Sequence, residues 1–368
     1  MPAPSPSIFI GLMSGTSLDG VNGVMLSMEP ARGFRLHGQH YLAFDQDLRN
    51  ALLALNSTGP NEIERSYVLG NRLAREYAQC VNTLLQQTGS DAVAVRAIGC
   101  HGQTIRHRPD LGYTVQIGNA ALLAELTGIC VVADFRSRDI AAGGQGAPLV
   151  PAFHQAAFAH ANKHRVIVNI GGISNLSSLQ PTGIVCGFDC GPGNVLMDGW
   201  IQRHRGENYD ADGAWAASGR IIPALLETLL AHPYFNQAPP KSTGRDTFHL
   251  PWLEAHLHPA YAAADVQATL LELTARSIAD SIARHCSRAD EVYLCGGGAH
   301  NLALISRLRQ LMPDTAIAPT DDLGIGADWV EAAAFAWLAQ QAIASQPANL
   351  PAATGASGAR ILGAIYPA

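Results

Sequence analysis

Short apolar runs separated by glycine-rich turns mark the start of the chain. The runs Ile8–Met13 and Val21–Met28 flank a segment of Gly, Ser and Thr, a pattern that predicts a β-hairpin. A third strand is expected over Phe34–Phe44, and helical spacing of apolar residues follows through about residues 47–87. Short strands near residues 97–100, 113–117 and 130–134 complete an α/β alternation.

The opening pattern returns near Arg165. The apolar letters VIVNI, a turn over residues 171–175 and the letters LSSL predict a second β-hairpin. The two turns share glycine and hydroxyl chemistry rather than letters, so we interpret the chain as two similar halves and not as a short repeat. We therefore expect an N-terminal domain over residues 1–155 and a C-terminal domain over residues 156–368.

The second half continues with further alternating elements. A strand is expected to end at Phe188, and helices are expected over about residues 195–203, 221–230 and 265–285. A strand at residues 291–295 precedes helices at about residues 301–312 and 329–341. The final helix can pack back onto the first half, and an apolar strand over Ile361–Tyr366 can cover a sheet edge.

Composition and charge narrow the class of protein. A length of 368 residues suits two domains, and 48% hydrophobic with 15% charged residues indicates a compact globular protein. The net charge of −6 and the absence of a long Lys/Arg run disfavour a nucleic-acid partner. No window approaches the ~20 apolar residues of a membrane helix, so the cytoplasm is the expected compartment. The seven cysteines contain no CxxC pair and are expected to be reduced and mostly buried.

The first turn, from Ser14 to Gly20, has the chemistry that a phosphate group needs. Glycines allow close backbone approach, N–H and hydroxyl groups can donate hydrogen bonds, and Asp19 can hold a hydrated cation. Because the turn joins two strands, it is neither a Walker loop nor a dinucleotide fingerprint. Taken alone, an ordinary hairpin with glycine turns explains the same letters.

Two further elements strengthen the phosphate hypothesis. The second hairpin supplies Gly171, Gly172, Ser174 and Asn175, and two such turns can hold one polyphosphate from both sides of a cleft. A glycine run at residues 296–298 lies between a strand and a helix, where a flat adenine or ribose can lie against backbone. A tight strand-to-helix connection is the alternative explanation of that run.

These elements together resemble the superfamily of actin, hexokinase and heat-shock chaperone ATPases. The segments GLMSGTSLDGV, HGQTIRH, VADFRSRDIAAGGQGAPLVP, NIGGISNLS, GFDCGPGNVLMD, PKSTGRDTF and VYLCGGGAHN are similar to those of the anhydro-N-acetylmuramic acid kinase family. The resemblance spans nearly the whole chain. It implies a two-domain actin-like, ribonuclease H-like α/β fold with a central interdomain cleft.

The resemblance also implies a reaction and its residues. The family opens the internal ether of a 1,6-anhydro amino sugar with water and phosphorylates the freed O6, with ATP and Mg²⁺ as cofactors. It implies Asp189 as the catalytic base, Glu331 as a helper and Asp19 as the metal ligand. The implied ATP-binding residues are Gly15, Thr16, Ser17, Leu18, Asp19, Gly20, Val21, Asn22, Gly171, Gly172, Ser174, Asn175, Gly296, Gly297, Gly298 and Asn301.

Loops that follow strands offer groups for the sugar. The candidates are His101, Gln103, Thr104, Arg136, Gln145, Gly146 and Pro148. The lactyl carboxylate of muramic acid suits an arginine, which Arg136 or Arg138 can supply. A surface ion-pair cluster with Asp134 and Asp139 is the alternative for these arginines.

Several alternatives stay open at this point. Asp189 can instead be a helix N-cap or turn residue, and Glu331 can be a first-turn glutamate favoured by the helix dipole. Asn22 replaces an Asp common in relatives, and residues 324–328 lack the usual proline-containing turn. A kinase for an unbridged amino sugar, or an actin-like or chaperone-like ATPase switch, are the competing functions. A homodimer is expected from the resemblance.

Overall fold

The computed structural model describes residues 7–15, 17–29 and 33–368, and its contacts divide the chain into two units. Unit 1 runs up to Ala157 and resumes at Trp329, whereas unit 2 spans Phe158–Asp328. The first division lies two residues from the expected boundary at 155/156. The predicted C-terminal domain differs in one respect, because residues 329–368 belong to unit 1.

Unit 1 is built on a six-stranded sheet, counted over the described residues, in the order β13-β7-β4-β1-β2-β3. The strands, in this spatial order, are β13 (Ala364–Tyr366), β7 (Val131–Ala133), β4 (Val95–Cys100), β1 (Ile8–Met13), β2 (Gly20–Glu29) and β3 (Gly33–Ala43). β1, β2 and β3 form an antiparallel meander, and β4 and β7 continue parallel to β1. β13 pairs antiparallel with β7, so the predicted covering of a sheet edge is confirmed.

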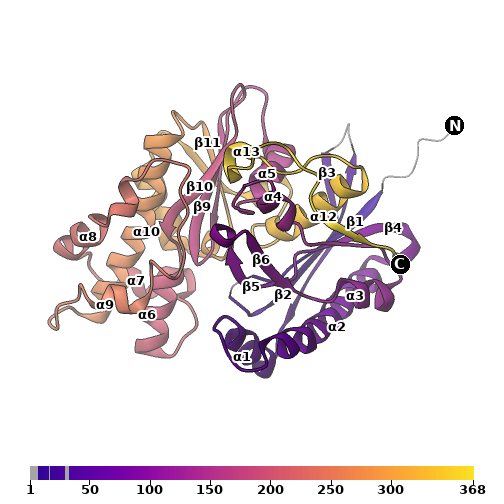
Figure 1. The fold of residues 1–368 in the computed structure, drawn as a ribbon. Helices are drawn as coiled ribbons and strands as arrows, with labels where there is room; N and C mark the ends of the chain where they lie inside the picture. Colours follow the sequence, from indigo (N-terminus) through magenta and orange to yellow (C-terminus); the bar gives the residue numbers. More distant parts are fainter. Residues whose placement is uncertain (1–6, 16, 30–32) are drawn as a thin grey trace. The chain divides into compact units, whose positions relative to one another are not determined.

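Helices cover both faces of this sheet (Figure 1). A Cβ atom on Gly11 would lie 1.8 Å from the carbonyl oxygen of Ala332 in α12 (Val330–Ile343), whereas one on Gly23 would meet Cys80 in α2 (Glu62–Thr88). Gly23 pairs directly with Leu12, the neighbour of Gly11, so the two glycines face opposite sides of the sheet. α2 and α12 therefore pack on opposite faces, and glycines allow the close approach of α12.

The remaining elements of unit 1 connect and flank the sheet. A separate hairpin joins β5 (Gln103–Arg108) to β6 (Tyr113–Ile117). The α-helices are α1 (Gln46–Leu55), α3 (Ala120–Thr127), α4 (Ser137–Ala141), α5 (Val150–Phe158) and α13 (Pro351–Thr354). α5 ends at the first residue of unit 2, and the other four lie in unit 1.

Unit 2 repeats the same strand arrangement in its own sheet, in the order β10-β9-β8-β11-β12. The strands are β8 (Arg165–Ile170), β9 (Ile173–Leu179), β10 (Cys186–Pro192), β11 (Glu291–Cys295) and β12 (Ala316–Pro319). β8, β9 and β10 form an antiparallel meander, and β11 and β12 are parallel to β8. The matching order and directions of the two sheets confirm the predicted α/β class with two similar halves.

Helices of unit 2 pack around α10 (Ala263–His285), whose side chains are buried along most of its length. α10 contacts α6 (Val195–Arg205), α7 (Ala214–Ser218), α8 (Pro223–Leu230) and α11 (Leu302–Leu311), as well as strand β10. The short helix α9 (Leu250–Glu254) contacts α6. Within the described part of the chain, no helix combines the length and apolar character needed to cross a membrane. All seven cysteines are free thiols, and five are buried.

Candidate active site

The turn between β1 and β2 is supported from the body of unit 1. Ser14 is buried, and its hydroxyl group lies 2.7 Å from the Tyr77 hydroxyl and donates to the carbonyl of Gly102. The Gln103 amide donates to the carbonyl of Gly15 at 3.0 Å. The turn is therefore fixed through Ser14 and the Gly15 carbonyl, while Ser17 and Asp19 are exposed.

Asp19 is the exposed carboxylate of this turn. Its Oδ1 accepts a hydrogen bond of 2.7 Å from the Ser17 hydroxyl, and its carbonyl accepts bonds from Tyr41 and from the Phe44 N–H. Among the described residues, no three His, Cys, Asp or Glu side chains gather as metal ligands. Any cation at Asp19 would therefore take most of its ligands from water and phosphate, as Mg²⁺ does in nucleotide sites.

The other predicted ATP-binding residues of the first hairpin mainly shape it. Leu18 is buried with a φ of 60°, and Val21 is buried in the sheet. A Cβ atom on Gly20 would lie 2.4 Å from the carbonyl oxygen of Leu42, so glycine is required there for close packing. Asn22 lies partly buried in β2. Thr16, also predicted to bind ATP, lies outside the described residues.

Arg136, His101 and Glu331 form a polar cluster in unit 1. The Arg136 guanidinium donates to Nε2 of His101 from both Nε and Nη2, at 3.2 and 3.0 Å, and to the carbonyl of Gly146 from Nη1. Because arginine only donates, Nε2 must be the acceptor and the histidine proton must lie on Nδ1. Burial and the charge of Arg136 lower the pKa of His101 to about 3, so the ring is neutral.

Glu331 lies in the first turn of α12 and faces the charge of Arg136. Burial raises the pKa of Glu331 above its usual value of 4.5, and Arg136 opposes that rise. Burial also lowers the pKa of Arg136 to about 10, which leaves the guanidinium charged at neutral pH. One helical turn further on, Phe335 packs against the His101 ring with centroids 4.7 Å apart. Two predicted site residues and the predicted catalytic helper therefore lie together.

Asp139 orders the glycine-rich loop next to this cluster. It is fully buried and accepts hydrogen bonds from the Gly146 N–H, the Asn349 amide and the Thr354 hydroxyl, at 2.8, 2.7 and 2.8 Å. A Cβ atom on Gly144 would lie 2.2 Å from Oδ2 of Asp139. The surface ion-pair cluster considered for this region is wrong, because Asp139 is buried and accepts neutral donors.

The remaining sugar candidates differ in exposure. Gln145 is exposed, and its N–H donates to the carbonyl of Thr354. Pro148 is partly buried and follows a cis peptide bond. Thr104 accepts a hydrogen bond of 3.1 Å from the Gln116 amide across the hairpin β5–β6. The carbonyl of Gly146 is used by Arg136, as described above.

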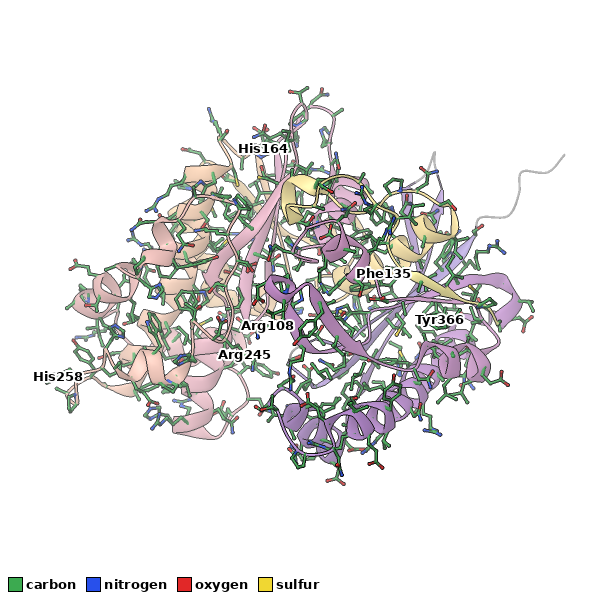
Figure 2. The ribbon with its side chains drawn as sticks, in the orientation of Figure 1. Arg108, Phe135, His164, Arg245, His258 and Tyr366 are labelled. Atoms are coloured by element: carbon green, nitrogen blue, oxygen red, sulfur yellow. The ribbon has the colours of Figure 1, made fainter. Side chains whose placement is uncertain are left out.

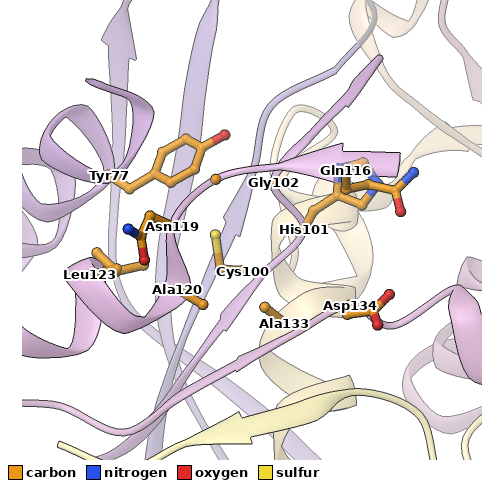
Figure 3. Close-up of a pocket in the computed structure, with 11 residues that line it drawn as sticks. Tyr77, Cys100, His101, Gly102, Gln116, Asn119, Ala120, Leu123, Ala133 and Asp134 are labelled. Atoms are coloured by element: carbon orange, nitrogen blue, oxygen red, sulfur yellow. The ribbon is translucent and has the colours of Figure 1, made fainter. Parts of the chain in front are cut away.

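A small pocket of about 20 Å³ lies beside His101 (Figure 3). Tyr77, Cys100, Ala120 and Leu123 form part of its apolar lining, and Gln116, Asn119 and Asp134 supply polar groups. Its volume suffices for about one water molecule or a methyl-sized group. Its lining includes Tyr77 and Gly102, which support the first turn, and His101, which is predicted to bind the sugar.

In unit 2, the turn between β8 and β9 is tied to the start of α6. The carbonyl of Gly171 accepts from the N–H of Asn194, and that of Gly172 accepts from Gly193 and Val195. A Cβ atom on Gly193 would lie 2.3 Å from the Gly171 carbonyl oxygen. The turn and the helix start therefore form one rigid element.

The predicted placement of Ser174 and Asn175 in this turn is wrong, because β9 begins at Ile173. Ser174 is buried, and its hydroxyl group donates to the carbonyl of Gly191. Asn175 is directly opposite Asp189 in β10 and Asn169 in β8. Directly paired residues share a face of a sheet, so Asp189, Asn175 and Asn169 form a polar row.

The glycine run after β11 continues from this row. Cβ atoms on Gly296 and Gly298 would lie 2.3 Å from Oδ1 of Asn169 and 2.2 Å from Cγ2 of Ile170, so both glycines are needed for packing. Gly297 has no such close neighbour. Asn301 is the N-cap of α11, where its side chain accepts from the Leu304 N–H. Within this glycine run, only Gly297 therefore offers open backbone against which a flat adenine or ribose can lie.

Asp189 lies in β10 beside a β-bulge, not at a helix N-cap. Its Oδ2 accepts hydrogen bonds from the Ser242 hydroxyl and the Thr243 N–H, both of 2.9 Å. Among the described residues, no hydrogen bond reaches Oδ1. Burial raises the pKa of Asp189 above its usual value of 3.8, while Thr243, Ser242 and the charge of Lys241 oppose this rise. The carboxylate is held by one oxygen, and the other is available as a proton acceptor.

Sequence reasoning missed the partners of these residues. The segment PKSTGRDTF contains Ser242, Thr243 and Arg245, but no role was assigned to any of them. Tyr77, which lies below the first turn, is in the middle of a long amphipathic helix and carries no local signal. For Ser242, Thr243 and Arg245, the available signal was the presence of a lysine, two hydroxyl residues and an arginine in one short segment.

Two matched α/β sheets, each with a glycine-rich hairpin, together with a partly buried carboxylate beside a bulge, are the arrangement of the two-domain actin-like ATPase class. A model of the anhydro-N-acetylmuramic acid kinase family matches residues 7–368. The chain therefore belongs to the anhydro-N-acetylmuramic acid kinase family.

Two relatives with similar sequences agree with this assignment. The anhydro-N-acetylmuramic acid kinase of Nitrosomonas europaea is 57% identical over 362 residues, which cover 98% of this chain and 99% of the relative. That of Thiobacillus denitrificans is 54% identical over 371 residues, which cover 100% and 99%. Among solved structures, component A of (R)-2-hydroxyglutaryl-CoA dehydratase from Acidaminococcus fermentans has a TM-score of 0.47 at 12% identity, covering 90% of this chain and 96% of that one.

Proposed function

We propose that the chain uses ATP to open and phosphorylate 1,6-anhydro-N-acetylmuramic acid, giving N-acetylmuramic acid 6-phosphate and ADP. This reaction returns a cell-wall sugar to metabolism. Family membership over residues 7–368 supports the activity and the substrate class. The observation that carries the chemistry is the arrangement of Asp189, whose Oδ2 is held by two donors while Oδ1 is left as an acceptor.

Asp189 acts as the general base in this proposal. Water attacks the anomeric carbon C1, the C1–O6 bond breaks, and the proton of water passes to Oδ1 of Asp189. The O6 oxygen carries the electron pair of the broken bond and attacks the γ-phosphorus, and the bond to the ADP oxygen breaks. The raised pKa of Asp189 suits this role, because a base with a pKa nearer the working pH accepts a proton more readily.

The remaining predicted residues divide between the two ligands. We assign nucleotide binding to the turn Gly15–Asn22, to Gly171, Gly172 and Asn175, and to the open backbone of Gly297. Supporting roles are assigned to Gly296, Gly298, Ser174 and Asn301, because packing or internal hydrogen bonds already occupy them. The exposed carboxylate of Asp19 and the Ser17 hydroxyl suit a hydrated Mg²⁺, which would supply charge neutralisation at the phosphates. His101, Arg136, Glu331 and the loop over Gln145–Pro148 are assigned to the sugar, together with Gln103 and Thr104.

Glu331 is assigned a positioning role beside Arg136. The guanidinium keeps two N–H donors beyond those used by His101 and Gly146, so it can still meet a carboxylate or a hydroxyl group. The charge of Arg136 favours the ionised form of Glu331 and so opposes the rise in its pKa that burial causes. This pair suits the orientation of a polar sugar.

The activity is tested by incubating the protein with ATP and Mg²⁺ in ¹⁸O-labelled water. With the anhydro sugar, mass spectrometry is expected to find a phosphosugar that contains one ¹⁸O at C1. Unbridged N-acetylmuramic acid serves as the second substrate and is expected to react far more slowly. Phosphorylation of the unbridged sugar alone, or a product without label, would contradict the proposal. Nucleotide-dependent polymerisation or peptide binding without sugar-stimulated ADP release would favour the ATPase-switch alternative.

The cytoplasmic location and the homodimer stay predictions. Size-exclusion chromatography with light scattering measures the mass of the assembly directly. A mass near twice 38.9 kDa is the expected result.

A further inference from the structure

The turn between β8 and β9 presents backbone N–H groups that have no partner within the described structure. Both of its glycine carbonyls are used by the start of α6, as described above. No backbone or side-chain hydrogen bond from the N–H of Gly171 or Gly172 is formed with any described residue. Adjacent free N–H groups in a glycine turn are donors suited to an anion.

The guanidinium of Arg245 lies against this turn. A Cβ atom on Gly172 would be 3.7 Å from Nη2 and 4.0 Å from Nε of Arg245. The arginine is labelled in Figure 2. Glycine at position 172 therefore leaves the backbone uncovered where the guanidinium approaches it. Two kinds of anion-binding donor meet at one place in unit 2.

Arg245 has no partner of its own that explains this position. It is exposed, and the structure shows no hydrogen bond from its side chain and no carboxylate within ion-pair distance among the described residues. Arg245 interacts electrostatically with Asp198 in α6, whose carboxyl is partly buried, but the two groups form no ion pair. The neighbouring Asp246 forms no ion pair with it. All five guanidinium N–H groups are therefore available.

The loop that carries Arg245 is anchored on both sides. Before it, the Asp189 N–H donates to the carbonyl of Lys241, and Asp189 accepts from Ser242 and Thr243. After it, the buried Phe248 donates its N–H to the carbonyl of Gly244. These bonds restrict Arg245 although its side chain is exposed. One short loop thus positions the proposed base and the free arginine together.

We propose that Arg245 and the N–H groups of Gly171 and Gly172 form an oxyanion-binding site that holds an anionic group of a substrate. The inference rests on the proposed function for the identity of those substrates. Two substrates offer such a group, the phosphates of the nucleotide and the lactyl carboxylate of the sugar. A guanidinium group binds phosphate and carboxylate groups alike through bidentate hydrogen bonds. In this proposal Arg245 is a substrate-binding arginine in addition to Arg136, which is assigned to the sugar above.

The test uses calorimetric titrations of the full-length protein and its variants Arg245→Ala and Arg245→Lys. The nucleotide arm compares AMP-PNP with AMP, which lacks the terminal phosphates. The sugar arm compares 1,6-anhydro-N-acetylmuramic acid with 1,6-anhydro-N-acetylglucosamine, which lacks the lactyl carboxylate. Arg220→Ala, another exposed arginine of unit 2 with no side-chain partner in the described structure, is the matched control. Thermal denaturation checks that each variant is folded.

Arg245→Ala is expected to weaken binding of one anionic ligand by about 10- to 100-fold, the effect of a charge-assisted hydrogen bond. Loss for AMP-PNP but not AMP identifies phosphate, and loss for the muramic but not the glucosamine sugar identifies carboxylate. Arg245→Lys is expected to bind this ligand more tightly than Arg245→Ala but less tightly than the wild type, because lysine keeps the positive charge but cannot form bidentate hydrogen bonds. Unchanged affinity for all four ligands, or equal loss for all four, would overturn the inference.

The inference and the proposed function fail separately. If the wild-type protein phosphorylates the anhydro sugar but Arg245→Ala binds every ligand normally, only the oxyanion site is wrong. If Arg245→Ala weakens AMP-PNP binding but the wild-type protein does not phosphorylate the sugar, only the proposed reaction is wrong.

Discussion

Replacing Asp189 by Asn separates the chemical role of this residue from its structural role. The two side chains have the same shape, and the asparagine carbonyl can accept both hydrogen bonds that Oδ2 now accepts. The amide group then takes the place of Oδ1, which removes the proton acceptor. We expect kcat to fall by about 10²- to 10⁴-fold, as for loss of a general base.

The same substitution has a predictable effect on stability. Because burial raises the pKa of Asp189, its ionised form is disfavoured in the folded protein above that pKa. A neutral Asn removes this cost, so the variant should be as stable as the wild type or slightly more stable at pH 7.5. Asp189→Ala instead leaves the Thr243 N–H without its acceptor, which costs about 1–3 kcal/mol. For a unit of this size that lowers Tm by roughly 2–12 °C.

The assays are coupled ADP release for kcat, calorimetric titration of AMP-PNP for nucleotide binding and differential scanning calorimetry for Tm. Asp314→Asn, an exposed carboxylate of unit 2, controls for the loss of one negative charge. AMP-PNP affinity should change less than about threefold in Asp189→Asn. The reasoning is refuted if Asp189→Asn keeps more than a tenth of wild-type kcat, or if it loses nucleotide binding in parallel with activity.

Three other substitutions test the surroundings of the site. Gly99→Ala would place a Cβ atom 1.9 Å from the Phe335 carbonyl oxygen and force α12 to shift, which should lower the free energy of unfolding in urea by about 1–3 kcal/mol. The control Gly358→Ala, whose Cβ atom would meet only the flexible side chain of Arg360, should change it little. Asp139→Ala removes the acceptor of three buried hydrogen bonds and should cost about 3–5 kcal/mol in the same assay; a cost under 1 kcal/mol would contradict that network. Burial raises the pKa of Asp198 to about 7, so ionisation of this group destabilises the folded protein as pH rises from about 4 to 7. The free energy of unfolding of Asp198→Asn should therefore exceed that of the wild type by up to about 4 kcal/mol at pH 8 and by nothing at pH 4. A difference that does not depend on pH would show that Asp198 does not titrate in this way.

Local patterns predicted most elements of the fold. Both β-hairpins, the strand Phe34–Phe44 and the long helices follow from apolar runs, glycine turns and helical spacing, which are signals within one segment. β12 was missed because a strand of four residues has too little pattern to detect. The turn over residues 171–175 was predicted too long, because polar residues in β9 look like turn residues when their pairing with Asn169 and Asp189 is unknown.

The candidate site was less accessible to sequence reasoning where contacts join distant segments. The donors to Asp189 come from more than 50 residues further along the chain, and Arg245 is still more distant from Gly172. Asn301 caps a helix and Ser174 is buried, although both have the side chains expected of a nucleotide site. The residue types indicated a nucleotide site. Which of their polar atoms remain available to a ligand depends on burial and on hydrogen bonds to distant residues, and both are set by the tertiary structure.

The return of α12 and β13 to unit 1 has a consequence for the order in which the chain folds during synthesis. Unit 2 is one continuous stretch and can fold as soon as Asp328 has left the ribosome. Unit 1 must wait for residues 329–368, because until then the glycine face of β1 and β4 and the outer edge of β7 remain uncovered. The nascent N-terminal sheet therefore stays incomplete until the last residues of the chain have been synthesised.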